Sequence, residues 1–106
     1  METERTIREI DFDGALIKKA IRIGCNMEIT FIVHDTTIRV LFNFISEEKS
    51  HIYKSMDEKI VNEIFPPLDR IETFINTHKK YVFSGYLKNE PWCVWEFKAK
   101  NYVISQ

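Results

Sequence analysis

The sequence is poor in the residues that usually build phosphate-binding loops and disulfide frameworks. It contains three glycines, three prolines and two cysteines in 106 residues. So few glycines leave no Gly-x-x-x-x-Gly-Lys or Gly-x-Gly-x-x-Gly loop, in which backbone amides cradle a phosphate. The glycines and prolines also form no linker and mark no internal repeat, so we predict one domain over residues 1–106.

Long apolar runs and a net charge of either sign are also missing. The apolar stretch 38–45 is interrupted by Arg39 and Asn43 and is far shorter than the about 20 residues that cross a bilayer. No signal-type apolar segment follows the polar residues 1–5, so we expect a cytoplasmic protein without a membrane partner. The net charge of −1 selects no class of partner.

No recognisable set of metal ligands or catalytic groups occurs. His34, His51 and His78 fall in separate predicted elements, without a His-x-x-x-His or Cys-x-x-Cys pair. We therefore predict no metal, no cofactor and no catalytic residue. Cys25 and Cys93 flank apolar runs, and we expect both to be buried, unpaired thiols.

The clearest local pattern is an alternation of apolar and polar residues. It covers residues 27–33 and resumes over 38–44, and a period of two is typical of strands. We predict a β-hairpin whose turn lies at residues 35–36. That turn would place Val33 opposite Ile38 and both apolar rows on one face.

The middle of the chain has helical spacing. Ser55 and Glu58 fit a capping box, and apolar residues follow at helical intervals up to the prolines at 66 and 67. A second helix is predicted to open at Pro67. Its apolar stripe consists of Leu68, Ile71, Phe74, Ile75 and His78.

Two segments stay ambiguous. Residues 14–23 suit a helix capped by Asp13 and ended by Gly24, but alternate apolar positions also suit a strand. We favour the helix slightly. Residues 102–104 either continue the preceding strand or form a short additional one.

Aromatic residues concentrate near the carboxyl end. The runs 81–87 and 92–97 predict a second hairpin with a loop at 88–91. Trp95 falls on the same side of such a strand as apolar neighbours, whereas Trp92 falls on the other, mixed side. We expect Trp95 to be buried and Trp92 to be exposed.

These elements define an α+β class. We predict a single antiparallel sheet of four to six strands with two or three helices packed on one face.

The acidic pair Glu47 and Glu48 could imitate a catalytic carboxylate pair, but we interpret both as solvated side chains. The basic and aromatic segment 78–102 offers three interpretations. It forms a core face with lysine-protected edges, a protein-binding face, or a surface for single-stranded nucleic acid. The residues that we predict to bind a partner are Trp92, Tyr86, Lys88 and Lys98.

Three segments resemble small immunity-type families of bacterial polymorphic toxin systems. They are Phe12-Asp13-Gly14-Ala15-Leu16-Ile17, Met27-Glu28-Ile29-Thr30-Phe31 and Trp95-Glu96-Phe97-Lys98-Ala99. In those families a Phe-His-Asp motif often leads into a strand, and here Asp13 and Gly14 stand at its His and Asp positions. The resemblance implies a strand over residues 15–23 and a role in binding and neutralising a partner, without a catalytic residue.

We therefore expect a small non-catalytic protein-binding domain, such as an inhibitor, an immunity factor or an accessory factor. The alternative is a module for single-stranded nucleic acid that uses the basic aromatic hairpin. An enzyme of unrecognised type comes third.

Overall fold

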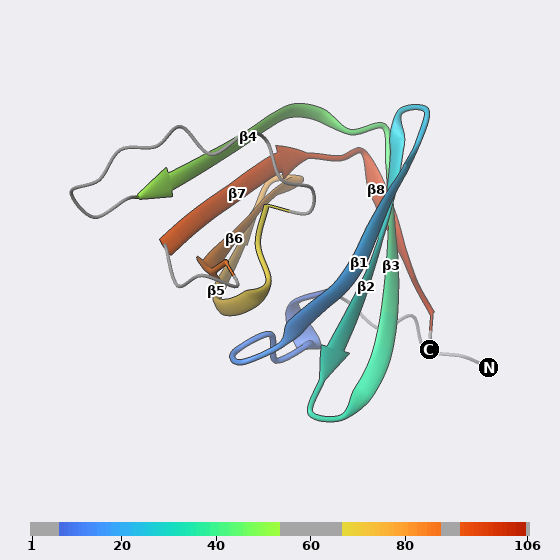
Figure 1. Cartoon of the computed structure of the whole chain (residues 1–106). Helices are drawn as coiled ribbons and strands as arrows, with labels where there is room; N and C mark the ends of the chain where they lie inside the picture. Colours follow the sequence, from blue (N-terminus) through green and yellow to red (C-terminus); the bar gives the residue numbers. More distant parts are fainter. Residues whose placement is uncertain (1–6, 54–66, 88–91, 106) are drawn as a thin grey trace.

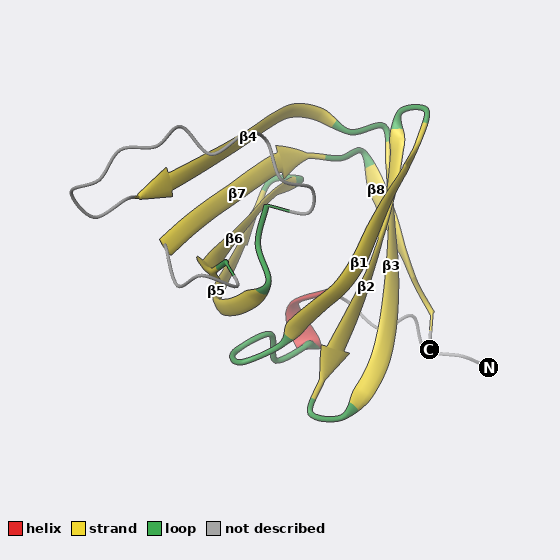
Figure 2. Ribbon diagram, in the orientation of Figure 1, coloured by secondary structure: helices red, strands yellow, loops and turns green. Residues whose placement is uncertain are grey.

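The computed structural model describes residues 7–53, 67–87 and 92–105. Eight antiparallel strands form one sheet in the order β4-β7-β6-β5-β1-β2-β3-β8 (Figures 1 and 2). A three-residue 3-10 helix, η1 (Ile7–Glu9), precedes them. The strands are β1 (Leu16–Ile23), β2 (Asn26–Val33), β3 (Thr36–Asn43), β4 (Ser46–Tyr53), β5 (Arg70–Thr77), β6 (Lys80–Tyr86), β7 (Trp92–Lys98) and β8 (Asn101–Ser105).

The predicted α+β class is wrong. The described residues form an almost purely antiparallel sheet, larger than the four to six strands expected and without an α-helix. The segment assigned to a helix from Leu68 to His78 contains β5, and the ambiguous segment 14–23 contains β1. The helix predicted from Ser55 lies outside the described residues.

A β-bulge explains the helical spacing in β5. The pairing of β5 with β6 shifts register between Ile71 and Thr73. The extra residue puts Ile71 and Phe74, which both pack in the core, three positions apart, and this is also the spacing of a helix face. Ile75, counted in the predicted stripe, is 58% exposed on the opposite side.

The same irregularity occurs in β1. Its register with β2 shifts between Ile17 and Lys19, so the core residues Ile17 and Ala20 also lie three positions apart. Gly24 does not end a helix but lies in the β1–β2 turn with φ of 60°. Glycine adopts this left-handed conformation without steric cost.

The hairpin of β2 and β3 is confirmed, although its turn is displaced by one residue. The turn residues are His34 and Asp35, with φ of 47° and 64°, as in a two-residue hairpin turn that matches the twist of the strands. Val33 consequently pairs with Thr36 and not with Ile38. Val33 and Ile38 are both buried, so the two apolar rows do share one face.

The carboxyl-terminal hairpin is confirmed as β6 and β7, and residues 102–104 belong to the separate strand β8. Strand β8 pairs with β3 while β7 pairs with β4. The two chain segments β3–β4 and β7–β8 therefore run side by side and turn together at residues 44–45 and 99–100 (Figure 1).

This turn divides the sheet into two halves that face each other. We call β1-β2-β3-β8 the first half and β4-β7-β6-β5 the second half. Where they adjoin along the sheet, β1 and β5 share only the pair Leu16 and Arg70. The core lies between the halves, since Phe31 of β2 stacks on Phe83 of β6 at 5.6 Å between ring centroids.

The segment before β1 supplies part of this core. Phe12 is buried, and its ring centroid lies 4.8 Å from those of Phe31 and Phe74 and 5.6 Å from that of Phe83. Full burial of a phenylalanine is worth about 1.5–3 kcal/mol. The Ile7 backbone N–H also donates to the Tyr102 hydroxyl at 3.0 Å, which fastens η1 to β8.

Candidate functional site

A row of large side chains crosses the outer face of the second half. Strand register places Tyr53 of β4 opposite Trp92 of β7, Trp92 opposite Tyr86 of β6, and Tyr86 opposite Arg70 of β5. Cross-strand partners point to the same side of a sheet. We call these four residues the outer aromatic row.

Three members of the row contact one another in series. The rings of Tyr86 and Trp92 meet edge to face with centroids 5.1 Å apart, and the Arg70 guanidinium lies 5.2 Å from the Tyr86 centroid. At the β4 end, His51 packs edge to face on Tyr53 at 4.4 Å. Tyr53 is 54% exposed, and Tyr86 and Trp92 are half-buried.

The two tryptophans differ as the parity of β7 predicts. Trp95 is fully buried beside Phe97, while Trp92 keeps part of its surface in solvent. The prediction that Trp95 is buried in the core is confirmed. Trp92 was predicted to be exposed, and it is half-buried on the outer face.

The four residues predicted to bind a partner do not form one cluster. Trp92 and Tyr86 are adjacent in the outer aromatic row. Lys98 lies six positions further along β7, roughly 20 Å away at the usual rise per residue. Lys88 falls outside the described residues.

Two lysines on this outer face have acidic partners. Lys98 Nζ lies 2.7 Å from Glu47 Oε2, and Lys80 Nζ lies 3.3 Å from Glu96 Oε2. The hydrogen bond from Lys98 is the main reason that the pKa of Glu47 is lowered from its ordinary value. These pairs offset positive charge that a phosphate backbone would otherwise attract.

Glu48 has a structural partner that sequence reasoning missed. A register shift between Ser46 and Lys49 in β4 turns Glu48 towards the core, where its Oε2 accepts a hydrogen bond from Trp95 Nε1 at 2.8 Å. Its other oxygen forms an ion pair with Arg22 of β1. The prediction of a solvated side chain is wrong for Glu48, and no spacing in the sequence marks a bulge at this point.

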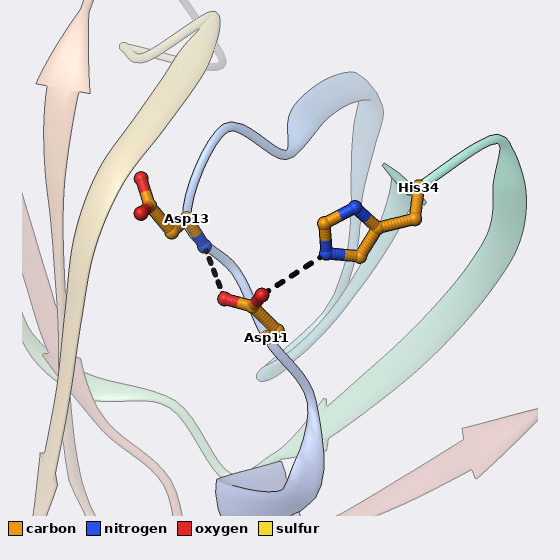
Figure 3. Close-up of polar contacts among 3 residues, drawn as sticks. All are labelled: Asp11, Asp13 and His34. Carbon is orange, nitrogen blue, oxygen red and sulfur yellow. Dashed lines mark hydrogen bonds and ion pairs between the residues drawn. The ribbon is translucent and has the colours of Figure 1, made fainter.

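Asp11, in the segment before β1, contacts His34 in the β2–β3 turn. His34 Nε2 lies 3.0 Å from Asp11 Oδ2, and Asp11 Oδ1 accepts from the Asp13 backbone N–H at 3.1 Å (Figure 3). The bond with His34 is the main cause of the lowered pKa of Asp11. Both side chains are about two-thirds exposed, at 67% and 65%, whereas catalytic acid–base pairs generally lie in desolvated clefts. The pair fastens the segment before β1 to the β2–β3 turn.

The two cysteines have different environments. Cys93 is buried in β7, and burial raises the pKa of its thiol to about 11. Cys25 is exposed in the β1–β2 turn, so the expectation of two buried thiols is wrong for Cys25. Both are free thiols.

Within residues 7–53, 67–87 and 92–105, no three His, Cys, Asp or Glu side chains gather as metal ligands would. In the same ranges, no helix has the length and apolar character needed to cross a bilayer. Comparisons with family models, curated proteins and solved structures give no match.

Proposed function

We propose that this chain is a small non-catalytic protein-binding domain and that the outer aromatic row is its contact surface. The observation that carries the proposal is the uninterrupted contact of Trp92, Tyr86 and Arg70 on an outward face. Tryptophan, tyrosine and arginine are the residues most enriched among binding hot spots.

The arrangement of the row supports binding with a small entropic cost. Trp92 and Tyr86 pack on each other, and the Arg70 guanidinium contacts both the Tyr86 ring and the Glu72 carboxylate, which lies 3.2 Å from Arg70 Nε. Side chains that are ordered before binding lose less conformational freedom when a partner arrives. Burying such rings under a partner supplies apolar area, while Arg70 supplies hydrogen-bond donors.

An inhibitor, immunity or accessory factor acting in the cytoplasm is the form of this function that we propose. The rival is a module for single-stranded nucleic acid, because bases also stack on exposed rings. The ion pairs of Lys80 and Lys98 favour the protein, since they reduce the positive charge of this face. An enzyme of unrecognised type remains the third prediction.

The test compares the double variant Trp92→Ala/Tyr86→Ala with the control Leu41→Ala/Val103→Ala, which truncates a cross-strand pair on the outer face of the first half. Thermal melts first show that the wild type and both variants are folded. Each protein is then immobilised, and the proteins that it captures from the native host are quantified by mass spectrometry. We expect one partner to be retained by the wild type and the control and to be lost with the row variant. Equal capture by both variants would contradict the assigned surface.

The nucleic-acid rival has its own measurement. Binding of a mixed-sequence single-stranded oligonucleotide is titrated at about 50 mM salt, where nonspecific affinity is strong, and again at higher salt. We expect no saturable binding. If the oligonucleotide binds with a salt-dependent affinity, and Trp92→Ala/Tyr86→Ala weakens that binding, nucleic acid and not a protein is the ligand of the row.

A further inference from the structure

A hollow lies where the paired segments β3–β4 and β7–β8 turn from one half of the sheet to the other. Its volume is about 500 Å³. The β1–β2 turn, the β5–β6 turn and the two links between strands line it. We call it the corner pocket, and its lining includes Cys25, Phe44, Ile45, Lys79, Lys98 and Lys100.

Backbone hydrogen bonds hold these segments together. The Ile45 N–H donates to the Cys25 carbonyl at 2.7 Å, joining the β3–β4 link to the β1–β2 turn. The Ala99 N–H donates to the Lys79 carbonyl at 3.0 Å, joining the β7–β8 link to the β5–β6 turn. The Lys100 N–H donates to the Asn43 carbonyl at 3.0 Å and joins the β7–β8 link to the end of β3. The pocket is therefore formed by the fold itself, before any ligand binds.

The lining combines an apolar part with an excess of positive charge. Phe44 is 55% exposed beside the half-buried Ile45. Of the three lysines, Lys98 is paired with Glu47. The ammonium of Lys100 lies 5.1 Å from the centre of the Phe44 ring.

Lys79 adds a charge that the described part of the chain does not balance. Among the residues that the structure describes, no carboxylate lies within ion-pair distance of Lys79. Its backbone is held in the left-handed region with φ of 64°, within the β5–β6 turn. The turn that carries Lys79 thus lines the pocket with a charge that no carboxylate in residues 7–53, 67–87 and 92–105 pairs with.

We propose that the corner pocket binds a small organic anion, a phosphate or carboxylate attached to an apolar group. The anionic group meets Lys79 and Lys100, and the apolar group lies on Phe44 and Ile45. The volume falls within the roughly 300–1,000 Å³ of pockets for small molecules. The site is separate from the outer aromatic row and does not depend on the proposed protein-binding function.

The experiment uses three probes that share one ring system: 1-naphthyl phosphate, 1-naphthoate and uncharged 1-naphthol. Binding is followed by the backbone amide NMR shifts of Ile45 and Lys100. A second readout is the rate at which iodoacetamide alkylates Cys25, which lines the pocket and is exposed. Cys93 is buried and serves as the internal control.

We expect saturable shifts and slower alkylation of Cys25 with at least one of the two anions, and weaker binding of 1-naphthol. The stronger of the anions then identifies the class of ligand. Lys79→Gln/Lys100→Gln should weaken binding of that anion by about tenfold, because it removes two charged contacts. The matched control Lys18→Gln/Lys19→Gln changes the net charge equally on β1, outside the pocket lining. Absence of saturable binding, equal binding of 1-naphthol, or equal weakening by both double variants would overturn the proposal.

Discussion

The two halves of the sheet follow the same alternation but use their rings differently. In β1, β2, β3 and β8, the aromatic residues Phe31, Phe42 and Tyr102 all pack in or against the core. The outer face of that half carries aliphatic side chains such as Val103, which is 57% exposed. In the second half, rings occupy both faces, with Trp95 inside and the outer aromatic row outside.

Inward aromatic side chains are needed to fill the core, whereas outward aromatic side chains are not. Burial of inward rings accounts for folding in both halves, because apolar area removed from water is the main stabilising contribution. The rings of Tyr53, Tyr86 and Trp92 in the second half are not part of that core. Their presence on one half only makes this half the better candidate for binding.

The largest effect is expected from the shared core. Phe31→Ala should lower the free energy of unfolding by roughly 3–5 kcal/mol, because the ring is fully buried against Phe12 and Phe83. Glu28→Ala, on the opposite face of the same strand, should change it by at most about 0.5 kcal/mol. Urea denaturation measures both, and comparable losses would show that the two faces of β2 are wrongly assigned.

A somewhat smaller loss is expected at Gly85 of β6, which packs on β5 within the second half. A Cβ added at Gly85 would stand 1.8 Å from the Arg70 carbonyl oxygen and 3.0 Å from Ile71 Cα, so backbone would have to move. Gly85→Ala should cost about 2–3 kcal/mol through this overpacking. Ser84→Ala, one position earlier in β6, should cost at most about 0.5 kcal/mol. Thermal melts measure both variants, and equal losses of stability would contradict the steric clash at position 85.

A moderate loss is expected from the link between β1 of the first half and β4 of the second. Glu48→Ala removes the acceptor of Trp95 Nε1 and the partner of Arg22, and should cost about 1–2 kcal/mol. Glu47→Ala is the matched control, since its carboxylate pairs with an exposed lysine, and should cost at most about 0.5 kcal/mol. Urea denaturation measures both variants. A loss for Glu48→Ala that is no larger than the loss for Glu47→Ala would show that Glu48 is solvated.

The smallest effect concerns the exposed pair of Asp11 and His34. The lowered pKa of Asp11 means that its charged form is stabilised in the folded protein. Its contribution is present above the ordinary pKa of 3.8 and is lost as pH falls through the lowered value. Asp11→Asn should therefore lower the urea midpoint slightly at neutral pH, and the difference should vanish on acidification. A difference that grows below pH 3.8 would contradict this sign.

Sequence reasoning succeeded where strand alternation is uninterrupted. The β2–β3 and β6–β7 hairpins and the inward position of Trp95 follow from a period of two. It failed at the bulges of β1 and β5, because one inserted residue changes the spacing of inward residues from two to three. A single sequence does not distinguish that spacing from a helical stripe.

The candidate surface was accessible from the sequence only in part. The parity of β7 separates Trp92 from Trp95, but strand order brings Tyr53 and Arg70 beside it from distant segments. Lys98 was grouped with Trp92 by proximity in sequence, and the extended strand separates them. The corner pocket is lined by two turns and two links that are far apart in the sequence. Local sequence patterns do not predict that these segments lie close together in the fold.

Trp92 faces outward while Trp95 belongs to the core, and acrylamide quenching of tryptophan fluorescence tests this assignment. The variant Trp95→Phe leaves only the ring at position 92, and Trp92→Phe leaves only the ring at 95. We predict a clearly larger quenching constant for the ring at 92, with both variants folded at the temperature of measurement. A ring at 92 that is shielded as well as or better than the ring at 95 would contradict the strand register and the proposed binding surface together.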